Sequence, residues 1–418
     1  MKTRRIKTIL LFLSTMPFIG IYAQSIYYVS PHASSGGDGS QATPFHIIHE
    51  AVEKARKDKN CTTIYLREGE YILDTPLVLT SADGNDSKEL IIRNYPGEKA
   101  IISSGITLDL KWEKYKNGIM RAAVKGNPVM DMLIVNGDLR SMARYPDYDK
   151  TAVRFNGTSA LATAPERVKK WKNPEGGYLH AMHSHDWGDF HYRITGKNEK
   201  GELQLEGGWQ NNRPMGIHPE NRMVENIFEE LDAPGEWYYD KQEGWLYYYP
   251  LSDENINELV FETPQLKNLI EIAGTSSHPV KNITIEGIEL TQTIRTFMEH
   301  YEPLLRSDWT IYRGGAVIFR GTEKCTLRDC YIHHVGGNGV FFDKYNRNSA
   351  VTGSYLTSIG ASAICFVGDV AGVRSPSFRY GEFVPLDKMD TAKGSQNDNH
   401  PAYCEVYDNL ICTIGLFE

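Results

Sequence analysis

The sequence predicts an all-β protein, a right-handed parallel β-helix solenoid with an N-terminal capping helix and a β-rich insertion domain. The first observation is a repeat of 24 residues, in which CTLRDCYIHHVGGNGVFFDK (325–344) is followed by SAVTGSYLTSIGASAICFVG (349–368). A third copy, CEVYDNLICTIG, occupies 404–415. The second observation is that apolar and polar residues alternate over short runs in each copy, which is the period of strands. Short strands repeated at such a period are typical of a solenoid.

Equivalent positions in the copies carry the same kind of residue. One column is apolar and another consists of glycine: Leu327, Val351 and Val406, and Gly336, Gly360 and Gly415. The segment 280–290 (VKNITIEGIEL) joins the same register. We expect these columns to stack, because each coil covers the apolar interior of its neighbours. A leucine-rich repeat, the alternative at this period, requires a regular leucine ladder with a fixed asparagine, which this sequence lacks.

The N-terminal segment 1–23 predicts a secretory signal peptide. It has a basic start, with Lys2 and Arg4, and then a short apolar run interrupted by Pro17. Such a run is too short for a membrane anchor. Its removal takes away four positive charges and changes the net charge from −8 to −12. We therefore expect a secreted, periplasmic or cell-surface protein with no membrane insertion and no nucleic-acid partner.

Residues 24–140 are predicted to form the N-terminal cap and the first coils. A strand, a glycine-rich loop, an amphipathic helix at about 43–58 and a further strand follow one another here. Ala51, Val52 and Ala55 give the helix an apolar face. We expect this helix to cover the open end of the first coil.

Residues 141–255 do not repeat and are rich in Trp, Tyr and His, which predicts a β-rich insertion domain. Residues 256–418 are predicted to be further coils, with long loops leaving them near 291–314 and 367–403. The six cysteines do not form a disulfide pattern. Cys325 and Cys404 share a column two coils apart, and a strand spacing of about 4.8 Å leaves roughly 9–10 Å between them, too far for a bridge. We expect buried thiols instead.

Several segments carry a resemblance to known proteins. They are YYVSPHASSGGDGSQATPF (27–45), LREGEYIL (66–73), LRSMARYPD (139–147), HAMHSHDWGDFHYRITG (180–196) and VENIFEELDAPGEWYYDKQEGWLYYYP (224–250). Together they resemble exported β-helix carbohydrate-active proteins, above all glycoside hydrolase family 141, which includes α-L-fucosidases and a xylanase. The resemblance implies further coils, bearing the family's catalytic acids, after a segment like 404–415. The chain stops at Glu418, so we expect this 418-residue form to be truncated, less stable, and weakly active or inactive.

Two acidic residues are candidates for catalysis on the coils. Asp343 follows the strand-like run GVFF, and Asp369 follows ICFVG one coil later. Glycoside hydrolysis uses two carboxyl groups, one as an acid and one as a base or nucleophile, and neighbouring coils place side chains at a suitable spacing. The alternative is that both are turn residues whose carboxylates bind nearby backbone N–H groups.

The substrate-binding candidates are His183, His185, Trp187, His191, His334 and Arg374. The histidines around Trp187 suit stacking on a sugar ring and hydrogen bonding to its hydroxyls. A metal site and core packing are the alternatives, and the absence of a second ligand group argues against the metal. We expect Trp187 and His191 to border the same groove as the loop 367–403, to which Arg374 belongs. His334 lies before a Gly-Gly turn, and a polar corner of the solenoid is its alternative role.

These residues lead to three hypotheses for function. The first is a glycoside hydrolase-like protein acting on complex polysaccharides, of α-L-fucosidase or xylanase type, without metal or other cofactor and acting as a monomer. The second is a non-catalytic glycan-binding or inactive protein. The third is a polysaccharide lyase, which needs a basic residue near an acidic sugar.

Overall fold

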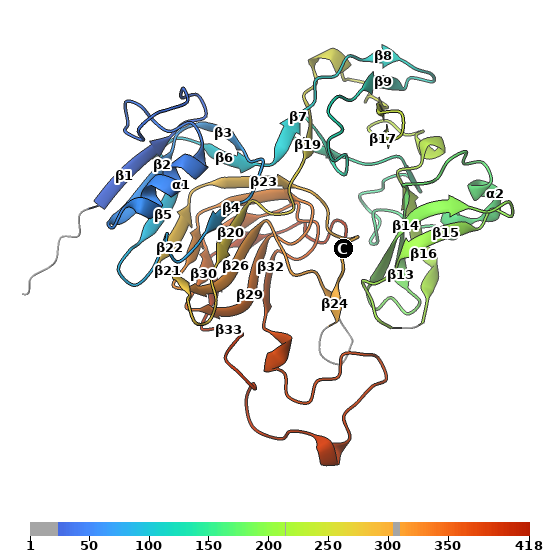
Figure 1. The fold of residues 1–418 in the computed structure, drawn as a ribbon. Helices are drawn as coiled ribbons and strands as arrows, with labels where there is room; N and C mark the ends of the chain where they lie inside the picture. The colour runs from blue at the N-terminus through green and yellow to red at the C-terminus, as the bar shows by residue number, and fades with distance from the viewer. Residues whose placement is uncertain (1–23, 214, 304–309) are drawn as a thin grey trace, which may run out of the picture.

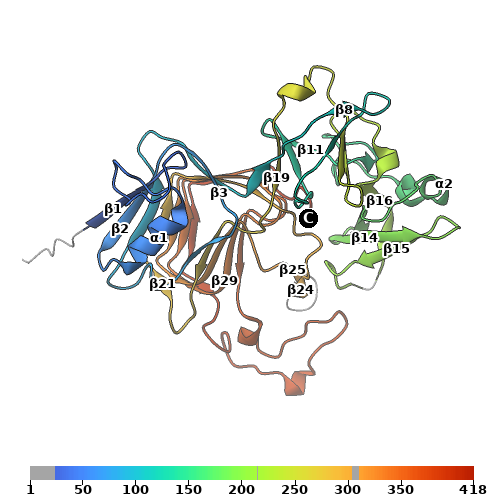
Figure 2. The ribbon, with the colours of Figure 1, turned by 45° about the horizontal axis from the view of Figure 1, so that its top comes forward.

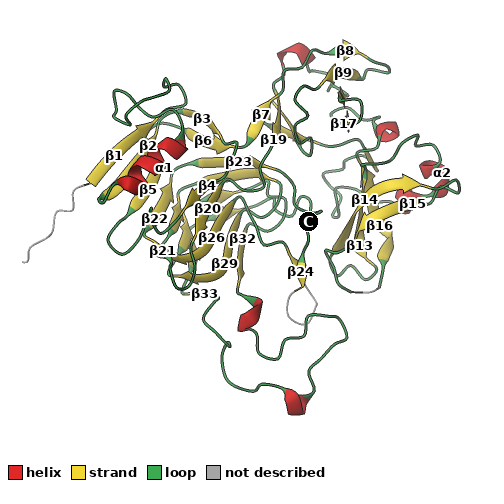
Figure 3. Ribbon diagram, viewed as in Figure 1, coloured by secondary structure: helices red, strands yellow, loops and turns green. Residues whose placement is uncertain are grey.

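A computed structural model describes residues 24–213, 215–303 and 310–418. The predicted signal peptide lies outside the described residues. The described chain is mainly β, with α1 (Ile48–Lys57) and α2 (Pro165–Val168) as its α-helices (Figure 3). No helix in these ranges is both long and apolar enough to cross a membrane.

Three parallel sheets run along the coiled part of the molecule (Figure 1). The first sheet contains, in spatial order, β1 (Gln24–Val29), β2 (Cys61–Leu66), β5 (Leu90–Asn94), β22 (Ile283–Glu286), β27 (Thr326–Arg328), β30 (Ala350–Thr352) and β34 (Glu405–Tyr407). The second contains β3 (Gly69–Ile72), β6 (Ala100–Ser103), β23 (Glu289–Thr293), β28 (Tyr331–Val335), β31 (Tyr355–Leu356) and β35 (Leu410–Ile411). The third contains β4 (Leu77–Leu79), β20 (Ile270–Ala273), β26 (Val317–Glu323), β29 (Val340–Arg347) and β32 (Ile364–Val367), with β21 (Val280–Lys281) and β33 (Pro401–Ala402) paired beside them.

The strand register confirms the predicted columns. Leu327 pairs with Val351 in parallel, and Val351 pairs with Val406. The same order continues to the earlier coil at 280–290, where Ile285 pairs with Leu327. Neighbouring coils therefore bring equivalent residues of the repeat side by side.

The interior between the three sheets is a continuous apolar core. Ile285, Leu327 and Val351 are fully buried in it. Burying a side chain of this size contributes about 1.5–3 kcal/mol. Phe319 and Phe342 stack with their ring centroids 4.5 Å apart, which repeats the column pattern with aromatic residues.

Helix α1 packs against the first strands, as expected for a cap (Figure 1). Its buried face consists of Ile48, Ala51, Val52 and Ala55. The helix begins at Ile48 rather than near 43, because Phe45 forms a β-bridge with Val29 and keeps the preceding residues extended. At its C-terminal end the Lys88 ammonium donates to the Ala55 carbonyl at 2.6 Å, which satisfies one of the last helical carbonyls.

Three antiparallel sheets form the second part of the molecule, beside the coils in Figures 1 and 2. One contains β11 (Asp138–Arg140), β10 (Leu133–Val135), β19 (Phe261–Pro264) and β7 (Gly105–Thr107). The next contains β12 (Arg144–Tyr145), β16 (Ile217–Glu225), β13 (Tyr178–His183), β14 (Asp189–Lys197) and β15 (Leu203–Gly207). The last contains β17 (Trp237–Asp240), β18 (Trp245–Tyr248), β9 (Met120–Ala123) and β8 (Glu113–Lys114). Because strands on both sides of 141–255 join these sheets, we propose that the insertion extends over about residues 105–264.

Two further segments lie outside these sheets. The loop between β32 and β33 projects from the coils, and β24 (Glu302–Pro303) pairs with β25 (Thr310–Ile311) near it (Figure 1). The chain ends between the coils and the antiparallel sheets (Figures 1 and 2). There the Glu418 carboxylate accepts a hydrogen bond from Thr296 Oγ1 at 3.0 Å and another from the Tyr301 hydroxyl.

The six cysteines are free thiols. Cys325, Cys330 and Cys365 are buried, as expected, whereas Cys412 is exposed on the last coil. The expectation of buried thiols is therefore wrong for Cys412, and Cys61 and Cys404 are only half-buried. In this coil the side chains of Leu410 and Ile414 are likewise exposed. Leu410 belongs to β35, the last strand of its sheet, so no further described strand covers it.

Candidate functional site

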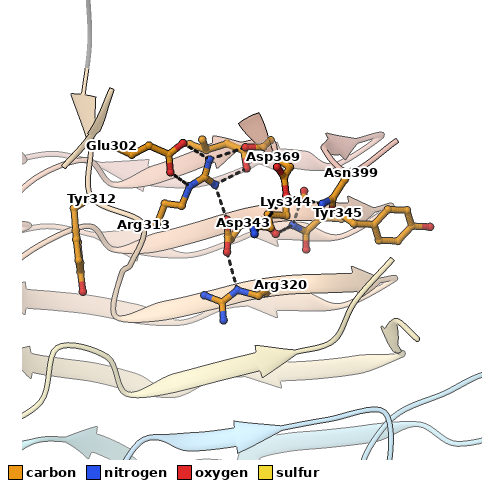
Figure 4. A network of polar contacts seen from close by, with 12 residues as sticks. Glu302, Tyr312, Arg313, Arg320, Asp343, Lys344, Tyr345, Asp369 and Asn399 are labelled. Atoms are coloured by element: carbon orange, nitrogen blue, oxygen red, sulfur yellow. Dashed lines mark hydrogen bonds and ion pairs between the residues drawn. The ribbon is translucent and has the colours of Figure 1, made fainter. Parts of the chain in front are cut away.

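Asp343 lies within β29 on the coils and is only 2% exposed. Its Oδ1 accepts from Arg313 Nη1 at 2.6 Å, and its Oδ2 accepts from Arg320 Nε at 2.7 Å (Figure 4). Both carboxylate oxygens are therefore occupied by guanidinium groups. This arrangement argues against the hypothesis that Asp343 is a catalytic acid or nucleophile, because both of its oxygens already bind guanidinium groups.

The two arginines extend this network across the coils. Arg313 also binds both oxygens of Glu302 and the Gly368 carbonyl (Figure 4). Arg320 donates to Glu271 Oε1 at 2.7 Å. Asp343 thus ties strands of three neighbouring coils together, which is a structural role.

Asp369 has the contacts of a turn residue. Its Oδ1 accepts from the backbone N–H of Ala371 at 2.9 Å, at the start of a short 3₁₀ helix, η5 (Val370–Gly372). Its Oδ2 accepts from Asn399 Nδ2 at 2.8 Å. The hydrogen bond from the Ala371 backbone holds the pKa of Asp369 below its usual value, with Lys344 adding to the effect. These contacts favour the turn interpretation over catalysis by an Asp343–Asp369 pair.

Of the histidines around Trp187, His183 lies on a strand and His185 does not. Strand β13 ends at His183, and a turn follows in which Asp186 has a φ of 57°, so His185 is not on the strand. His183 is buried and stacks on Trp187 with ring centroids 5.7 Å apart. The indole is 52% exposed.

The Trp187 ring is in contact with a guanidinium group. The Arg213 guanidinium lies 4.4 Å from its centroid and 5.3 Å from the ring centroid of Tyr380, which belongs to the loop 367–403. Arg213 thus links Trp187 to that loop, but the expected groove shared by Trp187, His191 and the loop stays a prediction. A sugar that stacks on the Arg213 side of the indole must displace the guanidinium, so the ring is not a free platform.

His191 and Arg374 do not have the predicted roles. His191 is fully buried, because it pairs directly with His180 in the sheet and both rings turn inward, with their Nδ1 atoms 2.7 Å apart. Arg374 donates to Asp390 Oδ2 at 2.7 Å and to two carbonyls of its own loop, those of Gly394 and Ser395. Arg374 therefore holds the loop together, and His191 is enclosed within the antiparallel sheet.

A cavity of about 580 Å³ lies where the antiparallel sheets meet the coils. Its walls come from four parts of the chain: the segment 138–148, the strands β13 and β16, the turn 233–237, and coil residues that include Arg295 and His334. His334 is the one predicted binding residue that lines it. Burial lowers the pKa of His334 to about 4, so the ring is neutral at pH 7.

Glu236 is the most unusual group of this cavity. It precedes β17 directly and is 3% exposed. Its Oε2 accepts weak hydrogen bonds from the backbone of Asp232 and Ala233 at 3.4 and 3.3 Å, whereas Oε1 has no partner among the described residues. Burial, reinforced by the nearby charge of Asp147, raises the pKa of Glu236 to about 8. The side chain is therefore a carboxylic acid at neutral pH, which is the state of a proton donor.

A second carboxylate of the cavity, Glu225, has the opposite surroundings. Arg295 Nη1 donates to it at 2.5 Å, and His180 Nε2 lies 3.2 Å away. Burial alone would raise the pKa of Glu225, but Arg295 and His180 together lower it well below its usual range. Arg295 also binds Asp131 through Nε and Nη2, at 3.0 and 2.9 Å. This ion network joins the coils to β16 and fixes one wall of the cavity.

Arg144 is a buried cation on another wall. Its guanidinium donates to the backbone carbonyls of Pro146, Phe155 and Gly157 at 2.7–3.0 Å. Within the ranges 24–213, 215–303 and 310–418 it forms no ion pair with a carboxylate. Its positive charge therefore acts on the cavity and on whatever occupies it.

Sequence reasoning missed Glu236, Asp147 and Arg144. All three lie in segments that carry the resemblance, LRSMARYPD and APGEWYYD. The available signal was the concentration of ionisable residues in these non-repeating segments, which the coil pattern does not require. Among the described residues, no group of three or more His, Cys, Asp or Glu side chains is placed to hold a metal ion.

The fold, but not the sequence, has a strong match among solved structures. A protein titled glycoside hydrolase superposes with a TM-score of 0.73 over 94% of this chain and 74% of its own length, at 19% identity. A complex of XylC with xylose matches with a TM-score of 0.46 and 13% identity, over 94% of this chain and 54% of its own. An uncharacterized protein, YwoF of Bacillus subtilis (strain 168), is 34% identical over 88 residues, which are 21% of this chain and 17% of that protein. No protein-family model matches the chain.

Proposed function

We propose that this protein is a glycoside hydrolase that acts on complex polysaccharide glycans in the cavity between the antiparallel sheets and the coils. The observation that carries the proposal is Glu236, a buried carboxyl group with a pKa near 8 and one oxygen without a protein partner. A proton donor held protonated at neutral pH is what cleavage of a glycosidic bond requires.

In this mechanism Glu236 protonates the glycosidic oxygen of the leaving sugar. The bond between that oxygen and the anomeric carbon then breaks, and positive charge develops on the remaining sugar ring. Asp147, whose charge acts on Glu236 across the same cavity, serves as the second carboxylate, either activating water or attacking the anomeric carbon. The neutral imidazole of His334 and the cavity walls bind the sugar hydroxyls.

The substrate type follows from the resemblance to family 141, which implies α-L-fucoside or xylan cleavage. The shared fold with a protein titled glycoside hydrolase supports the same class of activity. We further propose that the coils form a right-handed β-helix and that the protein is exported after removal of 1–23. It acts as a monomer, without metal, other cofactor or nucleic-acid partner.

The test is to incubate the purified chain with aryl α-L-fucosides, xylo-oligosaccharides and uronate-containing oligosaccharides. New reducing ends, without the ultraviolet absorbance of an unsaturated product, are expected from a fucoside or xylan substrate. Affinity without any turnover would instead support the glycan-binding hypothesis and contradict hydrolysis.

One observation favours a polysaccharide lyase as the second candidate. Arg144 places a buried positive charge beside the cavity without a carboxylate partner in the described ranges, as a site for a uronate would. In that case uronate-containing substrates give an unsaturated, absorbing product, and the Arg144→Gln variant loses it.

A further inference from the structure

A second cavity, of about 630 Å³, lies beside the first. The two cavities share Asp131 and Arg295, so this ion pair is their common wall. The second cavity is lined by the loop 127–131, the segment 173–178, the hairpin turn after β17 and the coil residues 294–299. Neither Glu236 nor any other group of the proposed mechanism lines it, apart from the shared wall.

The walls of this cavity hold polar groups that no protein atom satisfies. Tyr178, Tyr238 and Tyr239 line it, and within the described residues none of their hydroxyls has a hydrogen-bond partner. Asn226 donates through Nδ2 to the Gly176 carbonyl at 3.0 Å, while its buried Oδ1 has no partner in the same ranges. An unpaired buried acceptor such as Asn226 Oδ1 is costly and rare in folded proteins. Together with the three tyrosine hydroxyls around the same cavity, it indicates a ligand that pairs with the lining.

The side chains that line the second cavity indicate which class of ligand it binds. Phenol hydroxyls and side-chain amides both donate and accept, as sugar hydroxyls do, and the tyrosine rings offer apolar surface to the C–H faces of a sugar. Four acidic and three basic side chains line the cavity, which leaves almost no net charge for an ionic ligand. The Arg295 guanidinium is already taken by Asp131 and Glu225, so it is not free to bind an anion.

We propose that the second cavity is a separate, non-catalytic binding site for a neutral sugar. It holds glycan next to the first cavity and does not take part in bond cleavage. The proposal does not depend on hydrolysis, because binding at this site needs neither Glu236 nor Asp147.

The test measures binding of xylotriose and of methyl α-L-fucoside by calorimetry, in the Glu236→Gln background so that the probe is not consumed. The double change Tyr178→Phe/Tyr239→Phe removes two hydroxyls and leaves the rings in place. We expect it to weaken one binding event by about tenfold or more, since each neutral hydrogen bond is worth roughly 1 kcal/mol. Tyr192→Phe, in β14 and outside both cavities, is the matched control and should leave binding unchanged.

Hydrogen exchange gives a second readout, which locates the bound sugar on the chain. Bound sugar should slow exchange in 173–178 and 238–242. Turnover of a small aryl glycoside should be the same in Tyr178→Phe/Tyr239→Phe as in the natural sequence, whether or not the first cavity proves to be the active site. The proposal is overturned if neither probe binds, or if binding and exchange are unaffected by the double change.

Discussion

Asp343 on the coils and Glu236 in the first cavity are almost equally buried, at 2% and 3% exposure, but their surroundings are opposite. Asp343 has a guanidinium on each oxygen, whereas Glu236 has two weak backbone hydrogen bonds and one unpaired oxygen. Burial without a bound cation raises the pKa of Glu236, whereas both oxygens of Asp343 are bound by guanidinium groups. The comparison teaches that the partners of a buried carboxyl group, more than its burial, decide between a structural and a chemical role.

The largest expected effect is on turnover. Glu236→Gln keeps the shape of the side chain but removes the transferable proton, so kcat/KM should fall by about 10²–10⁴-fold, the usual contribution of a general acid. Steady-state kinetics on the best substrate of the panel measures this change. Glu243→Gln, in the exposed turn between β17 and β18, is the matched control and should retain full activity.

The second effect concerns Asp343 and is expected on stability, not on turnover. Asp343→Asn leaves Arg313 and Arg320 without their shared anion, which should lower the free energy of unfolding by about 3–5 kcal/mol. Urea denaturation checks this, with the exposed Asp253→Asn as control. If the variant keeps its stability but loses turnover, the structural role is contradicted and Asp343 is a catalytic residue.

The coils were predictable because their pattern is local and periodic. Leu327, Val351 and Val406 stack as the 24-residue spacing requires, since every coil must bury the same column. The first helix was predicted from the apolar face of Ala51, Val52 and Ala55, and only its start was misplaced, by the bridge at Phe45.

The site was less predictable because it depends on contacts between distant segments. The pKa of Glu236 is raised because the side chain is buried and because Asp147, 89 positions earlier in the chain, lies nearby. No spacing rule predicts that these two segments lie close together. The partners of Asp343 are likewise 30 and 23 residues away. Sequence reasoning singled out acids of the repeating coils, Asp343 and Asp369, and missed those in the irregular insertion.

The third effect is the contribution of Glu236 to the pH dependence of stability. Its pKa is about 8 in the folded state and near 4.5 when unfolded, so between these values the folded state holds a proton that the unfolded state has lost. The contribution of Glu236 to the free energy of unfolding should therefore fall as pH rises through this range, by at most about 1.4 kcal/mol per pH unit. The free energy of unfolding is measured by denaturation at several pH values for the natural sequence and for Glu236→Gln. The difference between the two proteins at each pH is the contribution of Glu236. A difference that is constant with pH would mean that Glu236 is ionised throughout.

The smallest effect is expected at Asp369, the other acid on the coils. Asp369→Ala removes the cap of η5 and the contact with Asn399, which should cost about 1 kcal/mol, as for other N-caps. Thermal denaturation measures the loss, and turnover should be unchanged. A loss as large as that of Asp343→Asn would show that the projecting loop and the coils unfold together.

The most direct test is to titrate Glu236 itself. Carboxyl carbons of ¹³C-labelled glutamate are followed by NMR between acidic and alkaline pH, and the signal that is missing in Glu236→Gln identifies the residue. A midpoint near pH 8 is predicted, with loss of kcat/KM over the same range as the proton donor ionises. A midpoint near the ordinary value of 4.5 would contradict the assignment of Glu236 as the acid of a glycoside hydrolase.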